Sequence, residues 1–69
     1  MQKSLEKQLA SFLRKRRGDQ TFAQFSRKLG LSESTLHRIE NGQQSVTLSR
    51  LQQILDRLKC SLWDVFGEK

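Results

Sequence analysis

The stretch FAQFSRKLGLSESTLHRI, residues 22–39, decides how this chain folds. Its residues Phe22, Phe25 and Leu29 recur at the i, i+3, i+7 spacing of one buried helix face. Gly30 follows at once, and glycine readily adopts the left-handed backbone conformation that ends a helix. The first half of the stretch therefore predicts a short helix that stops at a tight turn.

A second short helix is predicted directly after this turn. Ser32 is a favourable N-cap, and Leu36 with Ile39 gives the helix an apolar face. The dipeptide Asn41-Gly42 marks its end. Ser26 is small, as two crossing helices require where they approach closely. Two short helices joined in this way are typical of a unit that places its second helix in the major groove of DNA.

A longer helix is predicted before the stretch, from about Ser4 to Arg17. Residues 18–20 form a turn, and Thr21 caps the next helix with Gln24 at the spacing of a capping box. The apolar face of the first helix is expected to consist of Leu5, Leu9, Phe12 and Leu13.

Two more helices are predicted after residue 42. Thr47 caps the fourth helix, residues 59–61 end it, and Leu62 with Val65 is expected to fill the inward side of a short fifth helix. The expected fold is all-α, a compact five-helix bundle that forms one domain over residues 1–69. The apolar face of the fourth helix is expected to consist of Leu48, Leu51, Ile54, Leu55 and Leu58.

The net charge and the few cysteine and histidine residues limit the classes of protein to which this chain can belong. The chain has 69 residues, a net charge of +6 and a pI near 10.3, which is typical of nucleic-acid-binding domains. The lone Cys60 excludes an intramolecular disulfide framework, and the single His37 argues against a metal site or a histidine-assisted nucleophile. We therefore expect no enzyme activity, cofactor or metal. The absence of a long apolar run predicts a cytoplasmic, nucleoid-associated protein with no membrane partner.

Together these features resemble the phage-repressor and Cro-like (XRE-type) helix-turn-helix family, from about Leu9 to Phe66. The resemblance implies a lambda-repressor-like DNA-binding domain, with the helix-turn-helix at the second and third helices. Phe22 is a departure, because the family usually has a phosphate-binding glutamine there, and we expect it to be a packing residue. The residues that carry the resemblance are Phe25, Ser26, Gly30, Leu36 and the run Ile39-Glu40-Asn41-Gly42.

Polar side chains follow the outer face of the third helix. Arg38 can donate two hydrogen bonds to guanine. Glu33 can accept one from cytosine, or pair with His37 one turn later. A solvated polar face is the alternative. The predicted base contacts are Glu33, Ser34, Thr35, His37 and Arg38.

Phosphate contacts are predicted around the loop that follows. Asn41 and the loop are assigned by the resemblance, and the free amides at the start of the fourth helix favour an anion independently. The alternatives are a solvated loop with Thr47 as a simple cap, and basic residues that only compensate the dipole of the first helix. The predicted phosphate contacts are Asn41, Gln43, Gln44, Ser45, Thr47, Arg50, Arg16 and Arg17.

The resemblance also implies a structural ion pair and a dimer. Glu40 is expected to pair with an arginine of the first helix, for which Arg14 is the best match. Trp63 and Phe66 are the predicted interface of a homodimer, with a monomer capped by Trp63 as the alternative.

The sequence thus predicts a sequence-specific regulator of transcription that binds double-stranded DNA, a repressor that recognises a palindromic operator as a homodimer. One alternative is an antitoxin-like module that binds a partner protein such as a toxin and autoregulates its operon. The other is a non-specific nucleic-acid binder, which would show steep salt dependence without sequence preference.

Overall fold

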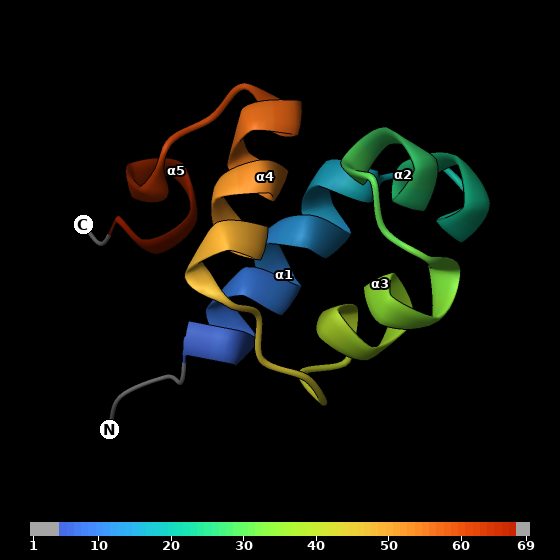
Figure 1. The fold of residues 1–69 in the computed structure, drawn as a ribbon, viewed down its shortest axis with the longest axis horizontal. Helices are drawn as coiled ribbons and strands as arrows, with labels where there is room; N and C mark the ends of the chain where they lie inside the picture. Colours follow the sequence, from blue (N-terminus) through green and yellow to red (C-terminus); the bar gives the residue numbers. More distant parts are fainter. Residues whose placement is uncertain (1–4, 68–69) are drawn as a thin grey trace.

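The computed structural model describes residues 5–67 and contains five helices there. The predicted all-helical fold is confirmed, although the predicted start at Ser4 lies outside the described residues. The helices are α1 (Leu5–Arg17), α2 (Phe22–Leu29), α3 (Glu33–Glu40), α4 (Leu48–Leu58) and α5 (Leu62–Phe66), as Figure 1 shows.

The predicted caps set the ends of these helices. Thr21 and Gln24 form the reciprocal capping box at the start of α2. Ser32 and Thr47 accept the capping hydrogen bonds of α3 and α4. Gly30 ends α2 with φ of 75°, in the left-handed region where glycine has no steric penalty. Local capping chemistry therefore fixes where the turn between α2 and α3 lies.

The five helices pack around one core. α1 runs through the middle and contacts α3 on one side and α5 on another, while α2 packs on α3 and α4 (Figure 1). α2 and α3 thus form one end of the molecule, and α5 lies at the other end. The core cluster consists of Leu9, Leu13, Phe25, Leu29, Leu31, Leu36, Ile39, Ile54 and Leu58.

Side chains of α4 hold the turn between α2 and α3. Gln53 Nε2 donates to the carbonyl oxygens of Leu29 at 2.8 Å and Gly30 at 3.3 Å. Arg57 donates to the carbonyl oxygen of Lys28 at 3.2 Å. These bonds satisfy carbonyl groups that the end of α2 leaves without intrahelical partners, so the turn is fixed on the bundle.

An ion pair joins the C-terminal ends of α1 and α3. The predicted pairing of Glu40 with Arg14 is wrong: Arg17 Nε donates to both carboxylate oxygens of Glu40, at 3.0 and 3.2 Å. Arg17 also donates to the carbonyl oxygen of Gln20 at 3.1 Å. The last residue of α1 faces Glu40 in this fold, whereas Arg14 is exposed one turn earlier. The pair fixes the helix after the turn against the first helix.

Three leucines that were expected in the core are exposed. Leu5 is 63% exposed, Leu48 85% and Leu62 53%. Leu48 and Leu62 open their helices, and Leu5 is the first described residue of α1. A helical side chain leans toward the N-terminus of its helix, so these side chains extend past the helix ends and away from the core. The amphipathic pattern is correct along α1, α4 and α5 but fails at the first residue of each of these three helices.

No helix in the described part of the chain is long and apolar enough to cross a membrane.

Candidate nucleic-acid interface

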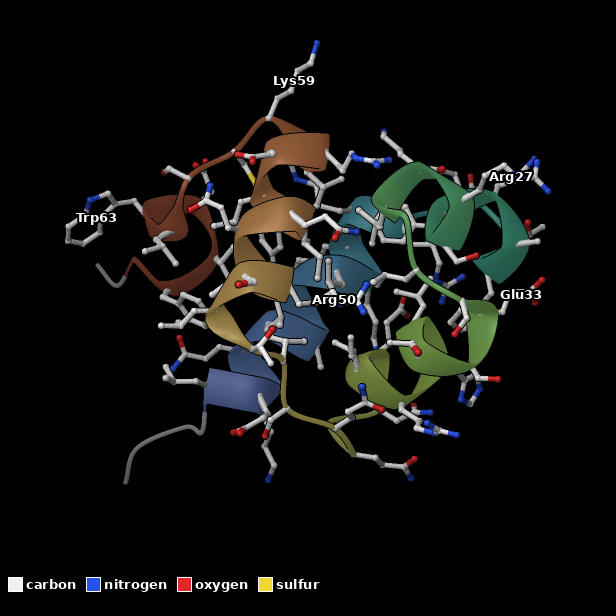
Figure 2. All side chains as sticks on the ribbon, in the orientation of Figure 1. Arg27, Glu33, Arg50, Lys59 and Trp63 are labelled. Carbon is white, nitrogen blue, oxygen red and sulfur yellow. The ribbon has the colours of Figure 1, made fainter. Side chains whose placement is uncertain are left out.

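The outer face of α3 carries the residues that were predicted to contact bases. Leu36 and Ile39 are buried, which turns the opposite side of the helix to solvent. Glu33 lies at the end of the molecule opposite Trp63 (Figure 2). The exposed polar residues on α3 and at its C-terminal end are Glu33, Ser34, His37, Arg38 and Asn41.

Thr35 differs from the rest of the predicted set. It is half-buried, its amide donates to Ser32 Oγ at 3.1 Å, and its hydroxyl accepts from Ser32 Oγ at 2.8 Å. The polar atoms of Thr35 therefore take part in the N-cap of α3. The exposed face of the helix is formed by other residues, such as Ser34 and Arg38.

His37 is held by residues on either side of it. Its ring lies 5.0 Å from the ring of Phe22, tilted by 43°, and Nδ1 lies 2.9 Å from Asn41 Nδ2. The structure places Asn41 beside Nδ1, where the sequence left a pairing with Glu33 open. Phe22 is partly buried against the core, which confirms the prediction that it is a packing residue.

A shallow hollow opens beside this ring. It has a volume of about 250 Å³ and is lined by Phe22, Glu33, Ser34 and His37. Three of these four residues are polar residues of α3, and the fourth is the aromatic Phe22 of α2.

The loop after α3 continues the polar face. Arg38 donates to Gln44 Oε1 at 3.4 Å, and the Gln43 amide donates to the carbonyl oxygen of Arg38 at 2.8 Å. Thr47 Oγ1 accepts from the amide of Arg50 at 3.1 Å, so Thr47 does act as a cap. Arg50 is exposed on α4 (Figure 2). The base-contact and phosphate-contact candidates are thus linked through Arg38 and Gln44.

Three of the predicted phosphate contacts are engaged elsewhere. Ser45 donates to Glu6 at 2.7 Å, and this hydrogen bond lowers the pKa of the Glu6 carboxyl. Arg17 is held in its ion pair, and Arg16 lies 5.2 Å from the ring of Phe12. Their predicted contacts with phosphate remain predictions.

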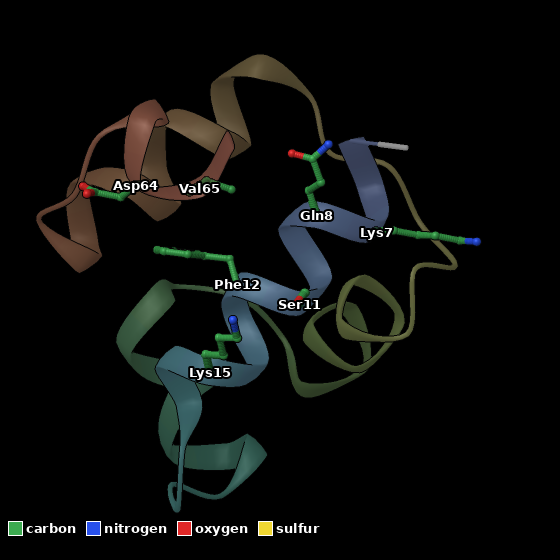
Figure 3. Close-up of a pocket in the computed structure, with 7 residues that line it drawn as sticks. All are labelled: Lys7, Gln8, Ser11, Phe12, Lys15, Asp64 and Val65. Atoms are coloured by element: carbon green, nitrogen blue, oxygen red, sulfur yellow. The ribbon is translucent and has the colours of Figure 1, made fainter. Parts of the chain in front are cut away.

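A second hollow lies between α1 and α5. It has a volume of about 500 Å³, and Figure 3 shows Phe12 on α1 and Val65 on α5 at its wall, with Lys7 and Lys15 on α1. None of its lining residues belongs to α3, so it is separate from the candidate interface.

The predicted dimer residues differ in exposure. Trp63 is 80% exposed and extends outward from α5 (Figure 2), whereas Phe66 is half-buried against the core. Phe66 also lines an apolar hollow of about 290 Å³ together with Leu5, Leu48 and Leu62. The exposed leucines therefore converge on one surface beside α5.

The fold and this face define a helix-turn-helix domain. The helix-turn-helix domain family matches residues 8–63, and the chain belongs to this family. It is accordingly a DNA-binding domain, as the predicted resemblance implied. Searches among curated proteins and solved structures found no match to the chain.

Proposed function

We propose that this protein is a sequence-specific regulator of transcription that acts as a repressor of the XRE type. The observation that carries the proposal is the exposed polar face of α3, on a helix fixed from behind by buried Leu36 and Ile39 and by the Glu40 ion pair. A helix held in this way can enter the major groove without rearrangement. Because α3 is already held in place, little conformational entropy is lost on binding DNA, and the affinity is higher for that reason.

In this proposal the side chains divide into base readers and phosphate contacts. Arg38 reads guanine O6 and N7 with two hydrogen bonds, positioned by its contact with Gln44. Ser34 and Glu33 face neighbouring bases. Phosphate contacts come from Asn41, Gln43, Gln44, Thr47 and Arg50, and the net charge of +6 supports them.

We infer that the protein acts as a homodimer through the surface around α5. The exposed leucines Leu5, Leu48 and Leu62 line one apolar hollow with Phe66, and Trp63, the neighbour of Leu62 in the sequence, is 80% exposed. Such a surface on a small domain favours an interface. A two-fold dimer would place two α3 helices in successive major grooves about 34 Å apart, on an inverted repeat. Occupancy of that operator, in the cytoplasm and on the nucleoid, would exclude polymerase.

The test is selection of bound duplexes from a random DNA pool at about 0.15 M salt, near physiological ionic strength. An enriched inverted repeat is expected. Arg38→Ala should weaken binding to the selected site by about 5- to 150-fold, the loss of one bidentate contact. Lys59→Asn is the matched control, because it also removes one positive charge but lies at the C-cap of α4, away from α3 (Figure 2).

Other results would favour the alternative functions. Retention of DNA without an enriched motif, with steep salt dependence, would indicate a non-specific binder. Failure to retain any DNA would favour an antitoxin-like module, whose toxin partner would cover Trp63 and the adjoining leucines. A monomer mass by sedimentation at tens of micromolar would contradict the homodimer.

A further inference from the structure

His37 is the exposed α3 side chain whose orientation the structure fixes most completely. Phe22 from α2 lies against one side of its ring, at 5.0 Å between centroids. Asn41, one turn later, places Nδ2 at 2.9 Å from Nδ1. The residue is exposed, and Asn41 lies against Nδ1 and not against the other ring nitrogen, Nε2. Two neighbours thus set both the tilt of the ring and the partner of one nitrogen.

Asn41 turns its amide nitrogen, and not its amide oxygen, toward Nδ1, and this orientation favours one tautomer of neutral His37. An amide nitrogen donates hydrogen bonds and does not accept them, so Nδ1 accepts from Asn41 Nδ2. A neutral imidazole with an accepting Nδ1 carries its hydrogen on Nε2. Nε2 is therefore a hydrogen-bond donor.

Phe22 is itself held in place. The Arg17 guanidinium lies 4.2 Å from the centroid of its ring, while Arg17 Nε is bonded to both oxygens of Glu40. Glu40 is buried on α3, three residues after His37. The Phe22 ring therefore contacts His37 of α3 and the guanidinium of Arg17, which is itself bound to Glu40 of α3. These contacts fix the position of Phe22 relative to α3, the helix that carries His37.

We propose that Asn41 and Phe22 are positioning residues that present His37 to DNA as a donor at Nε2. His37 then selects a base edge that offers an acceptor in the major groove: guanine N7 or O6, adenine N7, or thymine O4. It disfavours the amino group of cytosine, which is a donor. This inference rests on the proposed binding of DNA. It adds that His37 acts as the hydrogen-bond donor in its contact with a base.

The first experiment measures the tautomer in the protein without DNA. Long-range ¹H–¹⁵N correlation spectra report which imidazole nitrogen carries hydrogen, and His37 is the one histidine of the chain. The neutral ring of the wild type should carry hydrogen on Nε2. Asn41→Asp offers a carboxylate that only accepts, so the hydrogen should move to Nδ1. Hydrogen on Nδ1 in the wild type, or no change in Asn41→Asp, would overturn the positioning by Asn41.

The second experiment measures the readout on the DNA selected by the wild type. His37→Ala should flatten the preference at one base pair by about 2- to 12-fold, the range of one hydrogen bond. Phe22→Leu should weaken the same position and leave the guanine read by Arg38 unaffected. Circular dichroism melting confirms that each variant is folded under the binding conditions.

A base analogue then tests the polarity of the contact. At the base that depends on His37, a 7-deazapurine, or a thymine analogue without O4, should weaken binding of the wild type but not of His37→Ala. Equal losses in both proteins, or an unchanged preference in His37→Ala, would show that the ring contacts phosphate or solvent and would overturn the readout. A selection without any enriched motif would overturn the proposed function and the readout together. The tautomer and its reversal do not depend on DNA.

Discussion

Replacing Arg17 with alanine should destabilise the fold far more than replacing Arg14, although both changes remove one positive charge from α1. Glu40 is 2% exposed, and the Arg17 side chain 24%. Arg17→Ala leaves the Glu40 carboxylate buried with its cation removed. Loss of one partner from a buried pair typically costs about 3–5 kcal/mol. The same change also removes the cation over the Phe22 ring, worth about 0.5–1 kcal/mol where it is exposed.

These magnitudes are large against the stability of so small a domain. At about 0.05–0.15 kcal/mol per residue, this chain is stabilised by about 3–10 kcal/mol in total. A domain of this size loses about 4–8 °C in melting temperature per kcal/mol. The lower bound of 3 kcal/mol therefore corresponds to a fall of about 12 °C or more, and a chain at the low end of the range would be largely unfolded.

The assay is urea and thermal unfolding followed by circular dichroism at one pH and ionic strength. Arg14→Ala should stay within about 0.5 kcal/mol of the wild type, because Arg14 is exposed. Glu40→Gln should lower stability before it lowers DNA affinity. The double variant Arg17→Met, Glu40→Leu should recover much of the loss, since no unpaired charge remains. Equal melting temperatures for Arg17→Ala and Arg14→Ala would refute the reasoning.

Three further predictions concern residues in the connections between helices. Gly30→Ala should lower the free energy of unfolding by about 1–3 kcal/mol in urea, because φ is +75° and the new Cβ would lie 2.7 Å from Gln53 Nε2; an unchanged midpoint would contradict this. Lys59→Gly should raise stability by about 0.5–1 kcal/mol, because Lys59 ends α4 at φ of 56°; a lower melting temperature would count against it. Burial raises the pKa of the Cys60 thiol, so iodoacetamide at mildly alkaline pH should alkylate it more slowly in the folded chain than in the urea-unfolded one, measured by mass spectrometry.

The fold was predictable because its decisive signals are local. Thr21 with Gln24, Gly30 and Ser32 act through hydrogen bonds and backbone conformations within a few residues, so their spacing alone defines two helices and a turn. The outer face of α3 follows by geometry once Leu36 is buried, since positions on the opposite side must face solvent.

The contacts that tune the candidate site were not predictable, because they join distant parts of the chain. Arg17 and Arg14 lie one turn apart on the same helix. Which of them pairs with Glu40 depends on how α1 is oriented relative to α3, with the turn at residues 18–20 between α1 and α2. The contact between Phe22 and His37 depends on the crossing of α2 and α3. The one signal for this contact in the sequence was Phe22 at the first position of α2. It indicated a packing residue but did not identify His37 as its partner.

The exposed leucines show what hydrophobic periodicity does and does not report. Leu48 shares a face with the core leucines of α4, as its spacing predicts, but the spacing cannot tell whether another helix covers that end. Leu5 and Leu62 fail in the same way, and the three leucines line one hollow. Unrelated failures would scatter over the surface, whereas these coincide. A local rule that fails repeatedly at one place favours a function there. The clustering of the exposed leucines in one hollow therefore supports the proposed dimer.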